Sequence, residues 1–164
     1  MGKDLSRITL PVGLNQPIGN LQAMAANTEY IQLLERAADE ANSLRRLELV
    51  TTNMIAGLGV MERNQAKPFN CLLGETFELI TPTYKFLAEQ VSHHPPISAV
   101  YVKGKNFTFT GTQGVTPKFN GRFLSIEPTH RSYVDIKDEK YEICTPCFSV
   151  HNLVFGTTYT DLGG

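Results

Sequence analysis

The stretch TFELITPTYKFLAEQVSHHPPISAVYVKGKNFTFTG, residues 76–111, carries the clearest structural pattern in the sequence. Apolar and polar residues alternate in short runs, and turn-forming residues separate one run from the next. Alternation with a period of two is typical of a strand that buries one face. The stretch therefore predicts four strands: Thr76–Ile80, Tyr84–Val91, Ser98–Val102 and Phe107–Gly111.

The alternation continues to the end of the chain. It predicts five further strands: Phe119–Ile126, Arg131–Lys137, Lys140–Cys144, Phe148–Phe155 and Thr157–Asp161. Short turn segments such as Lys103-Gly104-Lys105-Asn106 favour hairpins between them. Consecutive strands joined by short turns imply an antiparallel meander rather than parallel units with crossover helices.

Upstream of Gly59 the apolar residues fall at helical spacing instead. We expect a helical stretch opened by Pro17, a second helix with Thr28 as its N-cap, and a third from Ser43 to about Gly57–Gly59. Their polar faces mix acidic and basic side chains, whereas helices that seek membrane surfaces lean basic. We therefore interpret the apolar stripes as core-packing faces.

These patterns predict an α+β fold: an N-terminal lid and helical layer, followed by an antiparallel β-meander that forms part of an incomplete β-barrel. We expect a single domain over residues 1–164, with a lid at 1–14, helices at 17–59 and barrel strands at 60–164.

Two adjacent histidines and a diproline follow the second predicted strand, in the octapeptide Glu89–Pro96. Histidine is the side chain most easily charged near neutral pH, so a pair of imidazoles can hold an anion. Adjacent residues of a straight strand face opposite ways. The prolines restrict the backbone and can bend it until both rings converge. We therefore favour ligand binding by His93 and His94 over a structural role.

The octapeptide resembles a signature of the oxysterol-binding protein family, whose ligand domains carry lipids between membranes. The segment Lys67–Glu78 is similar to the family's other signature, with Cys71 at a position where the family usually has proline. The two motifs occur in the family's order, and the resemblance runs from about Ile8 to Gly164.

The resemblance implies a non-enzymatic function: a sterol or glycerolipid is exchanged for phosphatidylinositol 4-phosphate at transient membrane contacts. It implies no cofactor and no metal. By matching positions, Lys67, Asn70, His93 and His94 would bind the phosphoinositide headgroup. A second set, of apolar residues, would serve as lid or face the lipid tail: Ile8, Leu10, Val12, Leu14, Leu72 and Leu73.

Composition limits the alternatives. The chain has 164 residues, 41% hydrophobic residues and a formal net charge of −1, which fits a globular domain and argues against broad nucleic-acid binding. No apolar run approaches the roughly 20 residues that cross a bilayer. Three cysteines without a secretory signal suggest reduced thiols, so we expect a cytoplasmic protein that is peripheral at membranes.

Cys144-Thr145-Pro146-Cys147 raises the possibility of a metal-dependent cytosolic enzyme. A closed zinc site needs four ligands and a second such pair is missing, so we interpret these residues as coincidental turn cysteines. A carboxylate–histidine catalyst at Glu89 lacks an accompanying nucleophile.

In the family the barrel continues beyond the point where this sequence ends. The expectation is a fragment, a barrel that another chain completes, or an abbreviated closure. The second functional hypothesis is accordingly a truncated, non-transporting regulatory protein that acts through an exposed strand edge.

Overall fold

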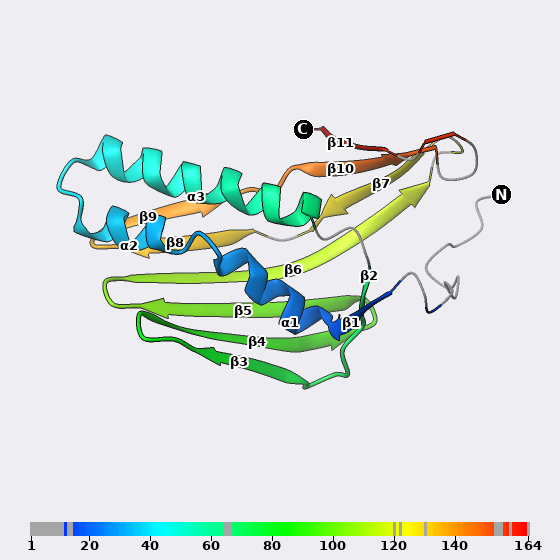
Figure 1. The fold of residues 1–164 in the computed structure, drawn as a ribbon, viewed down its shortest axis with the longest axis horizontal. Helices are drawn as coiled ribbons and strands as arrows, with labels where there is room; N and C mark the ends of the chain where they lie inside the picture. The colour runs from blue at the N-terminus through cyan, green and yellow to red at the C-terminus, as the bar shows by residue number, and fades with distance from the viewer. Residues whose placement is uncertain are drawn as a thin grey trace.

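A computed structural model of the chain describes residues 12, 15–63, 67–119, 121, 123–129, 131–152, 156–157 and 159–163. Within them the helices precede a large antiparallel sheet, so the predicted α+β class is confirmed (Figure 1). The sheet is not closed into a barrel in these residues, with β3 and β11 at the two ends of its strand order. Completion of the barrel by another chain stays a prediction.

From Asn15 to Arg63 the structure describes one short strand and four helical segments. They are β1 (Asn15–Gly19), α1 (Asn20–Ala25), the 3-10 turn η3 (Ala26–Thr28), α2 (Gln32–Asp39) and α3 (Ser43–Arg63). The helix predicted from Pro17 is wrong at its start, because Asn15–Gly19 pairs as a parallel strand with β2 (Lys67–Phe69). A proline fits there because it has no N–H to leave unpaired.

Thr28 is not the N-cap of the second helix. It ends η3, where its hydroxyl donates to the Ala25 carbonyl oxygen at 2.7 Å and bonds the Tyr84 hydroxyl at 2.8 Å. The third helix begins at Ser43 as predicted, with the Asn42 side-chain oxygen accepting from the Leu44 and Arg45 amides. It continues past Gly57 and Gly59 to Arg63, because isolated glycines weaken a helix without ending it.

The described residues of the large sheet form nine strands. Their bounds are β3 (Thr76–Ile80), β4 (Tyr84–His93), β5 (Pro96–Gly104), β6 (Phe107–Phe119), β7 (Phe123–Pro128), β8 (Ser132–Ile136), β9 (Glu139–Ile143), β10 (Cys147–His151) and β11 (Tyr159–Gly163). The single strand predicted at Phe119–Ile126 is wrong, because the chain turns between β6 and β7. The part of Phe148–Phe155 beyond Asn152 lies outside the described residues.

The long strand β6 divides the sheet. One of its edges pairs with β5. The other edge pairs with β8 over 107–111 and with β7 over 115–119, so the connectivity is not a simple meander. The sheet forks there: β8 and β9 lie beside the first part of β6, and β7, β10 and β11 lie toward its other end (Figure 1).

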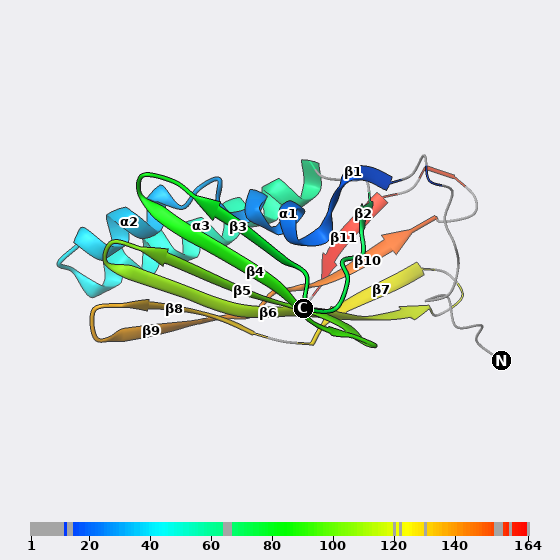
Figure 2. The same cartoon turned by 90° about the horizontal axis from the view of Figure 1, so that it is seen from below.

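The core lies between the helices and one face of this sheet (Figures 1 and 2). Alternate residues of β4 face the helices and are buried, as period-two patterning requires. The buried apolar side chains form one cluster: Leu21, Met24, Ile31, Leu34, Ala37, Ala38, Val50, Cys71, Phe86, Ala88, Val100, Val102, Phe107, Val134 and Ile136.

A buried arginine ties the helical layer to the far end of the sheet. The Arg46 guanidinium donates to both carboxylate oxygens of Glu139 in β9, at 2.9 and 2.7 Å. It also donates to the Glu40 and Ala41 carbonyl oxygens between α2 and α3, at 2.8 and 2.9 Å. Hydrogen bonds from Arg46 and then Tyr141 hold the pKa of Glu139 down, at about 2. This bidentate arrangement fixes the start of α3 against the β8–β9 hairpin.

Candidate functional site

A largely apolar cavity of about 200 Å³ lies between the helical layer and the concave face of the sheet. Four groups of residues line it: Met24, Asn27, Thr28, Ile31, Leu34, Asn53, Met54, Gly57 and Leu58 from the helical layer; Phe86, Val100 and Val102 from β4 and β5; Phe109, Thr112, Gln113, Gly114 and Val115 from β6; and Pro128, Ser132, Ile143, Thr145, Pro146 and Phe148 from later segments. Such a lining accommodates an apolar ligand.

One end of the cavity approaches the histidine turn. Gly114, which lines the cavity, pairs with Ile97 of β5. The next residue along β5, Pro96, pairs with His93 of β4. One step of the sheet ladder therefore separates the apolar cavity from the first of the two histidines.

A β-bulge at Val91 sets the direction of His93. The β4–β5 register shifts between Gln90 and Ser92, so β4 carries one extra residue. Without the bulge, His93 would share the outer face with the exposed Leu87, Glu89 and Val91. With it, His93 stands opposite Pro96, on the face that β5 buries with Ser98 and Val100. The bulge thus turns His93 toward the cavity side.

The two imidazole rings lie together. Their centroids are 4.7 Å apart and their planes meet at 67°, an edge-to-face arrangement. His93 is half-buried, and its Nδ1 is buried with no hydrogen-bond partner among the described residues. His94 is exposed and precedes Pro95 through a cis peptide bond. A buried polar nitrogen without a partner is unusual in a native fold and is available to a ligand.

Hydrogen bonds join the segment after β2 to the histidine strand. The Gly74 amide donates to the Gln90 carbonyl oxygen at 2.9 Å, and the Gln90 amide donates to the Glu75 carbonyl oxygen at 3.0 Å. The buried Gln90 side chain donates to the Ser92 carbonyl oxygen at 2.8 Å, across the bulge, and accepts from the Ser98 hydroxyl at 2.6 Å. The two sequence motifs are therefore neighbours in space.

Lys67 and Asn70 are both exposed, Lys67 in β2 and Asn70 just after it. Lys67 pairs with Asn15 of β1, whose side-chain oxygen is buried and has no hydrogen-bond partner among the described residues. The unpartnered Asn15 oxygen thus lies opposite Lys67 in the ladder, and the unpartnered His93 nitrogen lies beside the His94 ring. This arrangement suits a polar, anionic ligand.

The predicted site residues that the structure describes do not line the cavity itself. Leu72 and Leu73 are exposed and do not line it. Val12 is exposed, whereas Ile8, Leu10 and Leu14 lie outside the described residues. Glu75 braces its own turn, with its carboxylate accepting from the Leu72 amide at 2.8 Å.

The other sequence motif of interest shows no metal geometry. Cys144 and Cys147 are free thiols that flank the connection from β9 to β10. In the ranges that the structure describes, no group of three or more His, Cys, Asp or Glu side chains is placed to hold a metal ion. None of the described helices is long and apolar enough to cross a membrane.

Comparison with known proteins decides the family. The model of the oxysterol-binding protein family matches residues 1–164. The chain belongs to this family. It is 35% identical to mouse oxysterol-binding protein-related protein 2 and 38% identical to yeast oxysterol-binding protein homolog 2, with all of this chain covered in both cases. It spans 35% of the first relative's length and 13% of the second's.

Solved domains of this family share the fold. The Osh1 ORD domain in complex with ergosterol matches 99% of this chain and 41% of its own, with a TM-score of 0.90 and 38% identity. The Osh3 ORD in complex with PI(4)P matches 98% of this chain and 44% of its own, with a TM-score of 0.86 and 30% identity. The family and these neighbours are lipid-binding domains, not enzymes.

Three polar residues at the site were missed in the sequence. Gln90 and Ser98 read as ordinary inward positions of alternating strands, and Asn15 as part of a segment before a helix. The one available signal was a polar residue on a face otherwise filled by Phe86, Ala88 and Val100. Buried amides and hydroxyls at such positions need partners, and these partners shape the histidine turn.

Proposed function

We propose that this chain binds a phosphoinositide headgroup at the histidine turn and an apolar lipid in the adjoining cavity. His93, His94, Lys67 and Asn70 hold the phosphorylated inositol, with phosphatidylinositol 4-phosphate as the headgroup lipid. A sterol or glycerolipid occupies the apolar cavity. The two lipids compete for the one cavity and are exchanged between membranes that the protein contacts transiently.

The observation that carries this proposal is the buried, unpartnered Nδ1 of His93 beside the His94 ring. Desolvating a polar atom without a hydrogen bond costs about 1–3 kcal/mol, and a ligand that bonds this nitrogen would recover part of that cost. A phosphate oxygen accepts from a protonated imidazole nitrogen and offers such a partner. Lys67, exposed in β2, adds a positive charge in the motif region that hydrogen-bonds to the histidine strand.

The cavity supports the apolar half of the proposal. Pockets for small ligands usually enclose about 300–1,000 Å³. The cavity of about 200 Å³ therefore takes part of a sterol or an acyl chain. The rest lies along the concave face that continues over β7 and β10, where Ile126 and Val150 follow Phe148 on the same side by register.

By the same family resemblance, residues 1–14 serve as a lid over the bound lipid. The Osh1 and Osh3 domains, named with ergosterol and with PI(4)P, are the relatives that make one site for both lipid classes the better interpretation. The regulatory alternative, through an exposed strand edge, has only the open edges of β3, β9 and β11 among the described strands in its favour.

The headgroup assignment is tested with the double variant His93→Ala/His94→Ala. We expect extraction of phosphatidylinositol 4-phosphate from vesicles to fall to background while the far-ultraviolet circular dichroism is unchanged. The variant His151→Ala is the matched control, because His151 is a half-buried histidine in β10 outside this turn. Extraction that survives in the double variant would show that the histidines do not bind the headgroup.

The cavity assignment is tested with Gln113→Trp, which places a large ring at an exposed cavity-lining position of β6 that pairs with Ser98 and so lies on the same sheet face as Val100. We expect sterol binding to be lost, whereas binding of a water-soluble, short-chain phosphatidylinositol 4-phosphate is retained. Loss of both, with the fold intact, would mean that the headgroup and the apolar ligand are not held as proposed.

A further inference from the structure

The first motif region exposes three apolar side chains at the end of β2 and in the turn that follows it. Leu72 is 73% exposed, Leu73 66% and Phe69 45%. These three residues, called the apolar tip below, lie within one short segment that also contains Asn70 and follows Lys67. Single exposed apolar residues are ordinary, but three in one short segment beside a ligand site mark an interaction surface.

The apolar tip is exposed because its backbone is held in place. The Glu75 amide donates to the Leu72 carbonyl oxygen at 3.0 Å, and the Leu72 amide donates to the Glu75 carboxylate. Gly74, in the left-handed region at φ +77°, completes the turn and donates to Gln90. Cys71, immediately before the leucines, is buried in the core. With the backbone fixed from both sides, the leucines cannot fold back onto the protein.

We propose that Phe69, Leu72 and Leu73 insert into the interfacial region of a lipid bilayer and so seat the histidine turn against the membrane. This inference rests on the proposed function, because it names the surface through which the headgroup site meets its lipid. It assigns to Leu72 and Leu73 a role outside the cavity, in the bilayer.

Two features favour a bilayer over a protein partner. Three side chains on a narrow turn offer far less than the roughly 800 Å² that each partner contributes to a specific protein interface. An apolar tip beside a lysine suits the membrane boundary, where apolar side chains enter the acyl layer and cations meet anionic headgroups. The Leu72 amide and carbonyl oxygen and the Gly74 amide are already hydrogen-bonded within the protein, which lowers the cost of shallow insertion.

The first experiment measures binding to vesicles of phosphatidylcholine and phosphatidylserine that contain neither phosphoinositide nor sterol. We expect the variant Leu72→Ser/Leu73→Ser to bind at least about tenfold more weakly than the unchanged chain, since a fully buried leucine contributes more than a factor of ten. The matched control is Leu44→Ser/Leu47→Ser, which removes two leucines that are 70% and 49% exposed on α3. The control should bind within about twofold of the unchanged chain.

A second experiment uses the absence of tryptophan from the sequence. In Leu73→Trp the single indole should shift its emission to shorter wavelength on adding these vesicles and be quenched by brominated lipid. In Leu44→Trp, on α3, neither change should occur. Circular dichroism of each variant checks that the fold is retained.

Several outcomes would overturn the proposal. They are equal loss of vesicle binding in the two double-serine variants, no loss in either, no vesicle binding by the unchanged chain, or an indole at position 73 that vesicles leave unchanged. A blue-shifted indole without vesicles, together with a dimer in solution, would assign the tip to self-association instead.

Binding of short-chain, water-soluble phosphatidylinositol 4-phosphate separates this proposal from the proposed function. The Leu72→Ser/Leu73→Ser variant should bind it within about twofold of the unchanged chain, because no membrane is involved, whereas His93→Ala/His94→Ala should lose it. If the indole of Leu73→Trp enters vesicles but the unchanged chain does not bind the soluble lipid, the headgroup assignment fails and the proposed membrane surface stands.

Discussion

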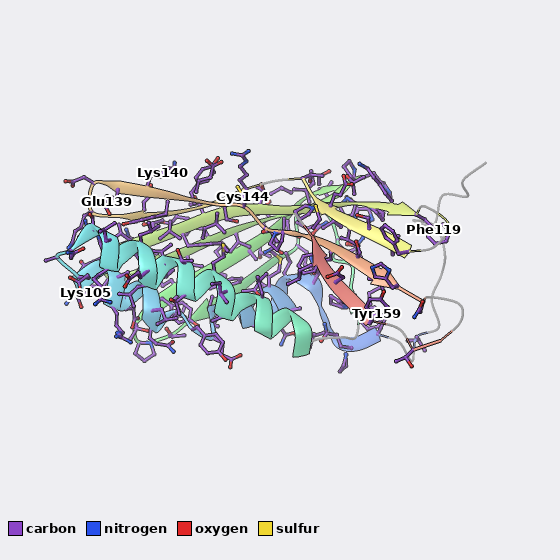
Figure 3. The ribbon with its side chains drawn as sticks, turned by 90° about the horizontal axis from the view of Figure 1, so that it is seen from above. Lys105, Phe119, Glu139, Lys140, Cys144 and Tyr159 are labelled. Atoms are coloured by element: carbon purple, nitrogen blue, oxygen red, sulfur yellow. The ribbon has the colours of Figure 1, made fainter. Side chains whose placement is uncertain are left out.

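The two halves of the sheet differ in what covers them. The covered half comprises β3, β4, β5, β8, β9 and residues 107–112 of β6, and it holds the fully buried side chains Phe86, Ala88, Phe107, Val134 and Ile136. The open half comprises β7, β10, β11 and residues 113–119 of β6. No described residue of β7, β10 or β11 is buried. Figure 3 shows Glu139 beside the helices, whereas Phe119 and Tyr159 lie beyond the end of the helices.

Both halves have alternating sequences and regular ladders, so pairing alone does not account for the difference. The helices make it: α1 contacts β3 and β4, α2 contacts β6, and α3 contacts β9. A sheet face gains stability from apolar area removed from water, and the covered half has more of that area removed. Stability should therefore concentrate in the covered half, and the open half should tolerate change.

The largest expected contrast compares two phenylalanines of one strand. Phe107, at the start of β6, is 2% exposed, whereas Phe119, at its end, is 47% exposed. We expect Phe107→Ala to lower the free energy of unfolding by about 3–5 kcal/mol. Phe119→Ala should change it by about 0.5 kcal/mol or less. Urea unfolding followed by circular dichroism measures both, and equal losses would refute the division into halves.

A smaller contrast compares two strand glycines. A Cβ added at Gly104, in β5, would lie 2.0 Å from the Phe107 ring, whereas one added at Gly163, in β11, meets no atom within 4 Å. Gly104→Ala forces the ring to move and should cost about 1–3 kcal/mol. Gly163→Ala should leave the thermal midpoint unchanged. A stable Gly104→Ala protein would mean that the covered half is packed less tightly than its burial indicates.

The smallest contrast is in pH dependence. Hydrogen bonds from Arg46 lower the pKa of Glu139 from its usual 4.5 to about 2. A carboxylate with a lowered pKa in the fold stabilises fully above its unfolded value and loses this contribution as the pH falls through the folded value. The gap in thermal midpoint between the unchanged chain and Glu139→Gln should therefore be constant above about pH 5 and shrink between about pH 4.5 and about pH 2.

The open half supplies the control for this titration. Lys118 and Glu127 form an exposed ion pair between β6 and β7, and such pairs contribute about 0–1 kcal/mol. Glu127→Gln should hardly move the midpoint at neutral pH. A gap for Glu139→Gln that widens on acidification would contradict the assignment of Glu139 as the stabilising carboxylate.

The sequence predicts best where alternation and turn chemistry agree. The strand Thr76–Ile80 is observed as predicted, because the turn at Thr81–Thr83 closes a clean alternating run. The predicted strand Phe107–Gly111 is too short, because β6 continues through Gly111 to Phe119. A glycine is needed at position 111 inside the strand, because a Cβ there would lie 2.3 Å from the hydroxyl oxygen of Ser132 in β8.

For the site, the motifs predicted that His93 and His94 lie together and that the two motif regions are neighbours in space. They did not predict the buried acceptor of Asn15 or the amide of Gln90. Neither residue differs in type or spacing from polar residues elsewhere in the chain. Only pairing between distant segments, such as β1 with β2 or Gln90 with Glu75, gives them their position.

The extra residue at Val91 gives His93 its face without fixing the length of the strand before it. Val91 itself faces outward and is exposed, so most substitutions there should be neutral. Deleting it would leave Ser92 opposite Ile97 and His93 opposite Pro96 in a continuous β4–β5 ladder, so His93 would keep its face. The bulge and a strand shorter by one residue are therefore two backbone solutions that place this histidine alike.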